Sequence, residues 1–519
     1  MNKSLLEKLL DYYHIDYDKY RDIIKDTSLA SFRDGHEFDD IDKAVKFVKD
    51  VIKNKGRIII YGDYDADGIM GTSILVKMFE YLDVVVDYYI PNRYKDGYGL
   101  NLEHAQEYVD KKYDLVITVD NGITAFEPIE LLHNNGIKVL ILDHHQAQDV
   151  LPKADAICHP IVSHFGEVSS SGAFTAFIYS ISLLNRVDKY LALLASISVI
   201  SDMMPLLEYN RDLLRSMFKA YVPGEFLAVD LLADHEMLNE TLIGMKIAPR
   251  INSIGRLTED ESINQIVNYF VSNNKETILN YYAFILQMNE ERKNISKIDL
   301  NYLDINTDSQ TIVIKGNYKE GIIGLIANSI MVKYSKPVIV FTLAIDGSLK
   351  GSARAPEGYD LVEAFGELGE YLLTSGGHSS AAGCSIKYED FDAFKNKFNE
   401  VISKKPVKKV EHSYIDILMS EICFENYELI ESFSPFGESW PYPLFRLRHI
   451  KVDTLTYSYD HKHIITSLGN KFKIVYFNYP EQFLQNRKFV DLVGSINKKS
   501  FKGRDYLEFV CRDFLDVND

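Results

Sequence analysis

Cysteine is scarce in this sequence and long apolar runs are absent, and each shortage excludes a class of protein. The four cysteines are Cys158, Cys384, Cys423 and Cys511. Because no two of them form a Cys-x-x-Cys pair, neither a zinc knuckle nor a disulfide framework is indicated. No apolar run reaches the roughly 18 residues of a membrane helix, and the acid-rich N-terminal segment has no signal-peptide h-region. We therefore expect core thiols in a reducing cytoplasm, and neither secretion nor membrane insertion.

Positive charge is also in short supply. The chain has 57 Lys and Arg residues against 75 Asp and Glu residues, a formal net charge of -18. This balance argues against a protein that coats nucleic acid by bulk attraction, although it is compatible with a local basic channel. An acidic total also suits carboxylates gathered around bound cations, because the metal neutralises the charge that such a site concentrates.

The sequence lacks repeats and low-complexity tracts, and what it contains is an alternation of strands and helices. Hydrophobic residues make up 46% and charged residues 25%, the proportions of an ordinary globular protein. From residue 57 onward, the apolar runs GRIIIYGD, VVVDYYIP, YDLVITVDNG and IKVLILDHH are separated by helical stretches of about ten residues or more. This alternation predicts βαβ crossovers and therefore a parallel sheet.

A chain of 519 residues has room for about three and a half domains, and the pattern predicts four parts. These are an α/β domain (1–210), a helical connector (211–305), a smaller α/β domain (306–403), and a linker followed by a small β-barrel (404–519). The connector is expected to contain one long helix over residues 275–304. The linker is indicated by Lys404, Lys405, Pro406, Lys408 and Lys409, since short charged segments with proline commonly join domains.

Acidic residues and histidines follow the strands of the first predicted sheet. They are Asp63, Asp65, Asp67, Asp120, Asp143, His144 and His145, and Asp202 follows a later apolar helix. The carboxyl ends of parallel strands share one edge, so these side chains are expected to meet in one crevice. Any single one of these aspartates is more often a turn former or a helix cap. The whole set, however, predicts a site that holds divalent cations.

The chemistry of these ligands favours hard cations. Carboxylate oxygens with one or two imidazoles suit Mn²⁺ or Mg²⁺ better than a thiophilic ion. Two such ions about 3.5 to 4 Å apart clamp the attacking and leaving oxygens in phosphoryl transfer. The sequence thus predicts a two-metal site for phosphate chemistry.

The order of these motifs resembles a known family. YGDYDADG, VDNG, DHH and SDMMPL are similar to the four motifs of the DHH phosphoesterase superfamily. The fuller pattern resembles the RecJ single-strand exonucleases, through PNRYKDGYGL, SDMMPLLEYNR, APRINSIGRL, GSARA, GGHSSAAG and SPFGESWPYPLF. The likeness covers roughly residues 30–519. It implies a parallel-sheet DHH domain, a long connecting helix, a smaller α/β DHH-associated domain and a C-terminal OB-like barrel.

The resemblance implies roles for the clustered ligands. Asp65 and Asp120 would hold one metal, and Asp67, Asp120, His144 and Asp202 would hold the other, with Asp120 bridging. Asp63 would support the first ion, because Tyr61 stands where many shorter DHH enzymes place a histidine ligand. His145 would face the scissile phosphate. Asp143 would orient the histidines, although a buried cap is an equally good interpretation of that residue.

The resemblance also implies two sets of phosphate contacts. Arg256, His378, Gly376 and Gly377 would contact the phosphate next to the cut, and Arg93, Ser352 and Arg354 would form a pocket for the 5′ phosphate. Arginine binds a terminal phosphate through paired hydrogen bonds, and anchoring that end sets the polarity of digestion. Taken alone, the glycine pair fits an ordinary turn better, and Arg93 fits a surface ion pair.

The C-terminal barrel resembles an OB fold, which binds single strands by stacking bases on aromatic side chains in a basic groove. Its expected contacts are Lys498, Lys499, Phe501, Lys502 and Arg504. An exposed hairpin with solvated lysines is an equally good interpretation. The chain departs from the RecJ pattern at Tyr318 and Lys319, to which we assign no catalytic role, and at Ser439 and Trp440, which bear on substrate contacts or packing.

Together these features imply an exonuclease that uses two Mn²⁺ or Mg²⁺ ions to degrade single-stranded DNA from 5′ to 3′ into mononucleotides. It would serve recombination and repair in the cytoplasm, with a single-stranded-DNA-binding protein and a helicase as candidate partners and no membrane. The first alternative is a DHH oligoribonuclease or cyclic-dinucleotide phosphodiesterase, which takes short substrates. The second is a non-catalytic scaffold that binds single strands.

Overall fold

The computed structural model describes residues 3–33, 38–163, 165–166, 168–296, 308–405, 413–468, 472–480, 484 and 487–517. The chain forms two compact units. The small unit contains Met1–Ser28, Pro205–Ser216 and Glu411–Asp519, and the large unit contains Leu29–Met204 and Met217–Val410. Across the described residues, no helix has the length and hydrophobicity needed to cross a membrane.

The large unit begins with a five-stranded sheet in the order β2-β1-β3-β4-β5. Its strands are β1 (Ile58–Tyr61), β2 (Asp87–Tyr89), β3 (Leu115–Val119), β4 (Lys138–Leu142) and β5 (Ala156–Cys158). All four pairings are parallel, as the alternation of strands and helices predicts. Every residue of β1 and β3 is buried, which explains their unbroken apolar sequences.

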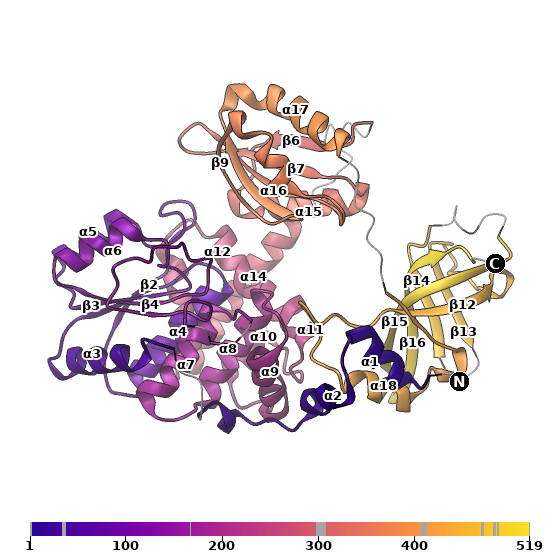
Figure 1. Cartoon of the computed structure of the whole chain (residues 1–519), viewed down its shortest axis with the longest axis horizontal. Helices are drawn as coiled ribbons and strands as arrows, with labels where there is room; N and C mark the ends of the chain where they lie inside the picture. The colour runs from indigo at the N-terminus through magenta and orange to yellow at the C-terminus, as the bar shows by residue number, and fades with distance from the viewer. Residues whose placement is uncertain are drawn as a thin grey trace. The chain divides into compact units, whose positions relative to one another are not determined.

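Helices cover both faces of this sheet (Figure 1). They are α3 (Ile41–Lys53), α4 (Ala66–Glu80), α5 (Leu102–Asp110), α6 (Phe126–Asn134), α7 (Gly172–Leu184) and α8 (Lys189–Ser201). On one face, Tyr108 of α5 and Leu132 of α6 pack with Ile59, Val116 and Val139 of the strands. On the other face, α4 packs against α7 and α8 and is buried along nearly its whole length.

A helical region follows, as the pattern predicts. Its helices are α9 (Glu208–Ala220), which passes from the small unit into the large one, α10 (Leu227–Leu232), α11 (Glu240–Leu242), α12 (Ala248–Leu257), α13 (Gln265–Val271) and α14 (Lys275–Ser296). The predicted long helix is present as α14, and its expected continuation over residues 297–304 lies outside the described residues.

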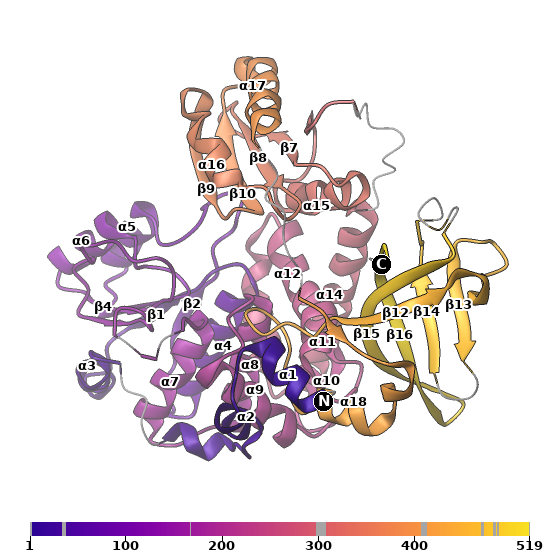
Figure 2. The same ribbon diagram turned by 45° about the vertical axis from the view of Figure 1, so that its right-hand side comes forward.

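The second α/β domain contains a mixed sheet in the order β6-β7-β8-β10-β9. Its elements are β6 (Ile312–Gly316), β7 (Val338–Leu343), β8 (Leu349–Arg354), β9 (Leu372–Gly377), β10 (Ala381–Ile386), α15 (Ile323–Tyr334), α16 (Leu361–Gly366) and α17 (Phe391–Lys404). Figure 2 shows α15 on one side of the sheet and α17 on the other. Strand β7 serves both layers, because Val338 and Val340 pack with α15 while Ile339 and Phe341 pack with α16 and α17.

The small unit contains a six-stranded sheet in the order β11-β12-β15-β16-β14-β13. Its elements are β11 (Ile415–Asp416), β12 (Phe445–Lys451), β13 (His463–Leu468), β14 (Phe472–Phe477), β15 (Phe489–Phe501), β16 (Arg504–Leu515), α1 (Leu5–Tyr13), α2 (Tyr17–Ile24) and α18 (Phe424–Glu431). Strands β15 and β16 form a hairpin whose two turn residues, Lys502 and Gly503, both have positive φ. The core of the predicted linker, at Pro406, Lys408 and Lys409, lies outside the described residues.

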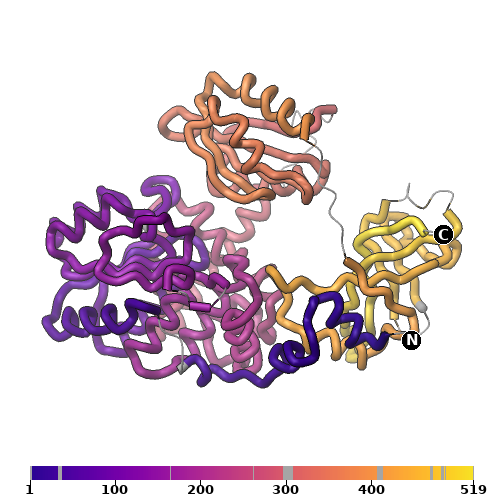
Figure 3. The backbone as a smooth tube through the Cα atoms, in the orientation of Figure 1, coloured from indigo at the N-terminus to yellow at the C-terminus, as the bar shows by residue number. Residues whose placement is uncertain are grey.

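The N-terminal helices pack with the C-terminal half of the chain (Figure 3). The ring of Tyr13 stacks on Trp440 with centroids 4.2 Å apart, and its hydroxyl donates to the carbonyl oxygen of Pro441 at 2.8 Å. The guanidinium of Arg211 lies 5.0 Å from the Trp440 ring. Trp440, where the chain departs from the RecJ pattern, therefore contributes to packing within the small unit.

This packing differs from the predicted division of the chain. The sequence pattern assigns residues 1–28 to a domain over 1–210, whereas in the structure they belong to the small unit. The reason is a set of contacts with residues more than 400 positions away, such as the Lys8 ammonium, which donates to the Asp416 carbonyl oxygen at 2.9 Å. Local sequence patterns carry no information about such contacts. The other predicted boundaries stay a prediction.

Candidate active site

The predicted ligands converge at the carboxyl edge of the first sheet. Three overlapping groups have ligand atoms within 4.8 Å of one another: Asp63, Asp65 and Asp120; Asp67, His144 and Asp202; and Asp120, His144 and His145. We refer to these seven residues as the carboxylate–histidine cluster. The strand ends bring together positions up to 82 residues apart in the sequence, as expected for a parallel sheet, and the C-cap of α8 adds Asp202.

His144 lies at the centre of the cluster. Its Nε2 is 3.1 Å from Asp120 Oδ1, 3.4 Å from Asp67 Oδ2 and 3.4 Å from Asp202 Oδ2. The His144 and Asp67 side chains are almost fully buried. One imidazole nitrogen thus faces three carboxylates from three separate segments of the chain.

The amino end of α7 binds the carboxylate of Asp67 and packs closely against Asp120. The backbone amides of Gly172 and Ala173 donate to the two oxygens of Asp67, each at 2.7 Å, and the Ser198 hydroxyl also donates to this carboxylate. A Cβ atom on Gly172 would lie only 2.7 Å from the Asp120 Cα, so the helix approaches this closely only because residue 172 is glycine. Asp120 itself has a φ of 63°, a strained conformation of the kind found at functional sites.

Asp65 and its neighbours are fixed by helix ends as well. Asp65 is the N-cap of α4 and accepts hydrogen bonds from the amides of Asp67 at 2.9 Å and Gly68 at 3.2 Å. From α12, the Asn252 side-chain oxygen accepts from the Ala66 amide at 2.8 Å. Asp65 is therefore a helix cap, the common alternative for such a residue, and a member of the cluster at the same time.

Like charges accumulate in this cluster. Burial and the neighbouring carboxylates raise the pKa values of Asp63, Asp65 and Asp120, and raise the pKa of Asp202 to about 9. Among the described residues, Asp63 Oδ1 and Asp202 Oδ2 are buried without a hydrogen-bond partner. A bound divalent cation would satisfy these oxygens and offset the repulsion, so the residues fit a hard metal ion.

The two histidines differ in charge. Burial lowers the pKa of His144, which favours the neutral form that a metal ligand requires. Burial acts in the same direction on His145, but the hydrogen bond and negative charge of Asp143 outweigh it and raise the pKa of His145 to about 9. Asp143 accepts from His145 Nδ1 at 2.8 Å and from the backbone amides of His144 and Ile123. Both interpretations of Asp143, orienting residue and buried cap, describe its contacts.

A second group of predicted residues lines a cavity of about 890 Å³ in the large unit. Arg93, Arg256, Ser352, Arg354 and Gly376 all line it, together with Lys350 and Glu320. We call it the arginine cavity. Burial, followed by the charges of Arg93 and Arg292, lowers the pKa of Arg256 to about 10. Crowded, desolvated guanidinium groups favour an anionic ligand such as phosphate.

The predicted phosphate-binding residues differ in their environments. Arg93 lies with its guanidinium 4.1 Å from the Tyr64 ring, and its Nε is buried without a hydrogen-bond partner in the described part of the chain. This environment disfavours the surface ion pair. Gly377 and His378 do not line the cavity. His378 is exposed in the turn between β9 and β10, where its amide donates to the Ala381 carbonyl oxygen at 2.8 Å.

Tyr98 is a site residue that the sequence pattern did not predict. Its hydroxyl lies 3.0 Å from His145 Nδ1 and 3.2 Å from the Asp120 carbonyl oxygen, and its side chain lines the arginine cavity. It therefore connects the carboxylate–histidine cluster with the cavity. The available signal was an aromatic residue between two glycines, Gly97 and Gly99, in a loop.

The predicted contacts of the OB domain lie on the β15–β16 hairpin. Lys498 forms an ion pair with Asp505 at 2.8 Å, and the Lys502 ammonium lies 5.4 Å from the ring of Phe501, which is exposed. Lys499 and Arg504 are also exposed. This geometry is compatible with both interpretations, a surface for single strands and an exposed hairpin.

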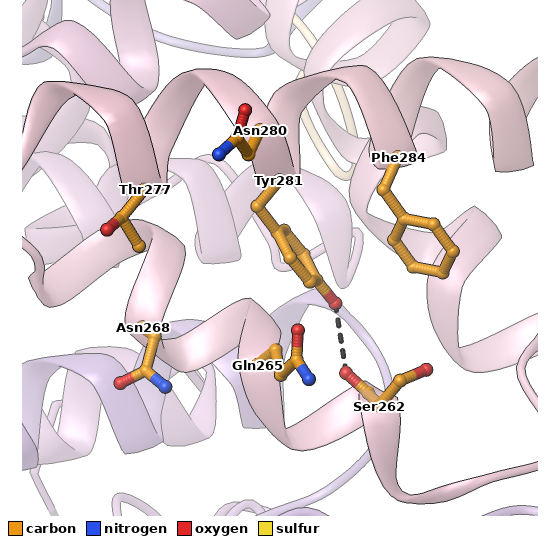
Figure 4. Close-up of a pocket in the computed structure, with 7 residues that line it drawn as sticks. All are labelled: Ser262, Gln265, Asn268, Thr277, Asn280, Tyr281 and Phe284. Carbon is orange, nitrogen blue, oxygen red and sulfur yellow. Dashed lines mark hydrogen bonds between the residues drawn. The ribbon is translucent and has the colours of Figure 1, made fainter.

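Another cavity, of about 550 Å³, lies beside α13 and α14 (Figure 4). Its lining residues are Ser262, Gln265, Asn268, Thr277, Asn280, Tyr281 and Phe284. None of these side chains is charged. The cavity therefore lacks the cations that distinguish the arginine cavity, and we assign it no phosphate.

Three family models match the chain in sequence order. The DHH family, N-terminal domain, matches residues 57–197, the DHHA1 domain matches residues 307–404, and the RecJ OB domain matches residues 415–513. The first match contains six of the seven residues of the carboxylate–histidine cluster. The second contains Ser352 and Arg354 of the arginine cavity.

Curated relatives extend the likeness over most of the chain. The single-stranded-DNA-specific exonuclease RecJ of Bacillus subtilis is 31% identical over 439 residues, which is 80% of this chain and 55% of the relative. The protein of the same name from Haemophilus influenzae is 29% identical over 486 residues, which is 86% of this chain and 83% of the relative. The chain thus spans about half the length of the first relative and most of the second.

Solved structures agree with the fold. RecJ of Thermus thermophilus, in complex with Mn²⁺, has a TM-score of 0.84 and 23% identity over 99% of this chain and 78% of its own. A manganese-bound exonuclease RecJ has a TM-score of 0.62 and 27% identity over 72% of this chain and 96% of its own. The solved structures confirm the predicted fold class, and the family models and curated relatives confirm the resemblance drawn from the motifs. The chain therefore contains a DHH domain, a DHHA1 domain and a RecJ OB domain, and over most of its length it is similar to single-stranded-DNA-specific exonucleases named RecJ.

Proposed function

We propose that this protein is a Mn²⁺- or Mg²⁺-dependent exonuclease that degrades single-stranded DNA from the 5′ end to mononucleotides. The observation that carries the proposal is the link through Tyr98 between a cluster fit for hard cations and a cavity lined by arginines. A phosphodiester lying in the cluster would have its neighbouring phosphate within reach of the cavity.

Within the cluster, Asp65 and Asp120 would hold one ion, supported by Asp63, and Asp67, Asp120, His144 and Asp202 would hold the other. Bound Mn²⁺ or Mg²⁺ would lower the pKa of an attacking water and neutralise charge on the phosphate oxygens. His145 would remain protonated at neutral pH because its pKa is raised to about 9 by Asp143, burial notwithstanding. It would therefore present a positive charge to the scissile phosphate.

The arginine cavity would determine polarity. Arg93, Ser352 and Arg354 would hold a terminal 5′ phosphate, and Arg256 would contact the phosphate next to the cut, with Gly376, Gly377 and His378 on the hairpin beside it. Arg354 donates to the Ser352 hydroxyl at 3.1 Å, so the two side chains already act as one unit. Holding the 5′ end at a fixed distance from the cluster makes each cut release one nucleotide.

The cellular setting of the proposal follows from this substrate. Recombination and repair generate single strands in the cytoplasm, a helicase supplies them, and a single-stranded-DNA-binding protein covers them. These two proteins would therefore be its partners, and the β15–β16 hairpin would contribute contacts to the strand through Lys498, Lys499, Phe501, Lys502 and Arg504. The relatives named single-stranded-DNA-specific exonuclease support the substrate of this proposal.

Nucleotide release from three substrates tests the proposal. A long 5′-phosphorylated single strand, a dinucleotide and a duplex of the same sequence are incubated with Mn²⁺ and, in parallel, with EDTA. We expect mononucleotides from the long strand only, and none with EDTA. Preference for the dinucleotide would favour an oligoribonuclease or cyclic-dinucleotide phosphodiesterase. Strand binding without metal-dependent release would favour a non-catalytic scaffold.

A further inference from the structure

Residues 92–101 form a loop that carries two side chains of the proposed site. Arg93 lines the arginine cavity, and Tyr98 lies against His145 and also lines the cavity. The loop contains two glycines with positive φ, Gly97 and Gly99. Such a loop needs contacts from outside its own sequence to keep one conformation.

A buried tyrosine supplies one of these contacts. Tyr61, the last residue of β1, is fully buried, and its hydroxyl donates to the Gly99 carbonyl oxygen at 3.1 Å. The same hydroxyl lies 3.3 Å from Nδ1 of His104, which is buried at the start of α5. Tyr61 therefore directs its polar atom to the loop and to α5. Tyr61 stands two residues before Asp63 in the sequence, but its hydroxyl contacts Gly99 of the loop and His104 of α5.

A carboxylate supplies the second contact. Asp96 Oδ2 accepts from the Asn92 amide at 2.7 Å and from the Tyr89 hydroxyl at 2.8 Å. Asp96 Oδ1 faces His104 Nε2 at 3.8 Å, and both side chains are almost fully buried. His104 thus lies between Tyr61 and Asp96, with one ring nitrogen toward each.

We propose that Tyr61, Asp96 and His104 form an anchor that positions Arg93 and Tyr98 for the terminal phosphate. The inference rests on the proposed function, since it assigns positioning residues to that site. It also gives a role to Tyr61: this residue holds the 92–101 loop and does not bind metal. The energetic basis is that buried hydrogen-bonding groups are costly to leave unpaired, so a network satisfied in only one loop conformation selects that conformation.

The chain offers a matched pair of variants. Tyr61→Phe removes the hydroxyl that reaches the loop and keeps the ring. Tyr108→Phe removes a hydroxyl that is buried in the same aromatic group but has no hydrogen-bond partner among the described residues. Asp96→Asn weakens the anchor from its other end and provides a second variant should Tyr61→Phe fail to fold.

Hydrogen exchange measures the anchor without any activity assay. In the metal-free full chain, we expect the amides of residues 92–101 to exchange roughly 2- to 10-fold faster in Tyr61→Phe and Asp96→Asn, the range that loss of one hydrogen bond implies. Exchange in β3 and in Tyr108→Phe should match the wild type. Unchanged exchange in the loop, or equal acceleration throughout the sheet, would overturn the proposal.

The preference for a 5′-phosphorylated end tests whether the anchor positions Arg93 and Tyr98 for the terminal phosphate. We expect the ratio of kcat/KM values for 5′-phosphorylated and unphosphorylated strands to fall several-fold in Tyr61→Phe and Asp96→Asn, with the Mn²⁺-induced rise in Tm as in wild type. Equal loss on both ends would mean a general structural effect and would overturn the positioning role, as would a weakened response to Mn²⁺. If the wild-type protein released no nucleotides, the proposed function would fail, while the exchange experiment would still decide whether the anchor exists.

Discussion

Asp120 combines a strained backbone, a close contact with α7 and membership of two ligand groups. Its backbone is in the left-handed region, its Cα touches the start of α7, and its carboxylate belongs to two of the three ligand groups. Its pKa is raised by burial and then by Asp67 and Asp65, so in the metal-free protein its charge opposes folding. The residue that serves the site best is thus a poor residue for stability.

Asp120→Asn separates these two effects. We expect kcat on a 5′-phosphorylated single strand to fall on the order of 10³-fold, because both proposed ions lose a ligand. We also expect the metal-free variant to be more stable by roughly 1–4 kcal/mol, because a buried like charge is removed. Turnover follows from nucleotide release, stability from urea unfolding in EDTA, and strand binding from fluorescence anisotropy. Near-normal turnover or a less stable metal-free variant would contradict the assignment.

The raised carboxylate pKa values also set a pH dependence. In the folded, metal-free protein the pKa of Asp202 is about 9, whereas the pKa of an aspartate in the unfolded chain is near 3.8. The folded state therefore holds more protons between these values, and stability falls as pH rises through that window. A bound cation replaces those protons. We expect the rise in Tm on adding Mg²⁺ to be larger at pH 8.5 than at pH 6, and scanning calorimetry at both pH values would reveal the reverse trend if it existed.

Arg354 tests the arginine cavity at the same scale. Its guanidinium is desolvated and contacts Ser352, and a terminal phosphate would be its charge partner. We expect Arg354→Ala to reduce kcat/KM roughly tenfold or more on 5′-phosphorylated strands, and less on unphosphorylated ones. Arg21→Ala is the control, because Arg21 pairs with Asp18 and both side chains are exposed. An equal loss on both kinds of end would remove the pocket from the proposed function.

Which residues the sequence could predict depended on their chemistry. Asp67, Asp120 and His144 could be predicted because they belong to a whole set of charged groups that follow buried strands, and the strands must end at one edge. Tyr61 and Tyr98 carry no such signal, since a tyrosine in a strand or a loop is ordinary. Their roles depend on how the 92–101 loop folds back over β1, and the sequence of the loop alone does not specify that path.

At the scale of elements, the sheet and the amino ends of α4 and α7 build the site together. The alternation of buried strands with helices was sufficient to predict the parallel sheet, because both faces of the sheet are covered. The contact between α7 and Asp120 was not predictable, since it depends on the closeness of two backbones. Only the glycine at position 172 permits it.

Gly172→Ala tests this contact between elements. The added methyl group would meet Asp120 at 2.7 Å, and backbone on both sides leaves little room to adjust. We expect a loss of roughly 1–3 kcal/mol in stability and a weaker response of Tm to Mn²⁺. Gly366→Ala in α16 is the control, because no atom of the described residues lies within 4 Å of the added Cβ. If Gly172→Ala retained wild-type stability and wild-type response to the metal, the close approach would not matter for the site.

At the scale of the whole molecule, the small unit is assembled from three separate stretches of chain. Trp440 is the only tryptophan and lies in the middle of this assembly, stacked on Tyr13 and next to Arg211. Its fluorescence therefore reports on the small unit alone. The sequence pattern predicted the strands of this unit. It did not predict that the N-terminal helices belong to the same unit, because the contacts that join them to it span most of the chain.

Tyr13→Ala tests this assembly. Removing a stacked ring and its hydrogen bond to Pro441 should destabilise the small unit by about 2–4 kcal/mol. We expect the urea midpoint followed by tryptophan fluorescence to fall, while the Mn²⁺ response of the large unit stays close to that of the wild type. Tyr17→Ala, at an exposed position of α2, is the control. Coincident fluorescence midpoints for the two variants would show that the stacking contributes nothing.

The bond between Tyr13 and Pro441 joins positions 428 residues apart. During synthesis α1 leaves the ribosome before its partner, which at about 5–20 residues per second follows only after roughly 20 to 90 s. Throughout that interval the apolar side of α1 is not yet covered by its native partners. Helix α1 must therefore wait through the synthesis of several hundred residues for its native neighbours, and nascent chains halted before residue 440 should be the ones that chaperones hold.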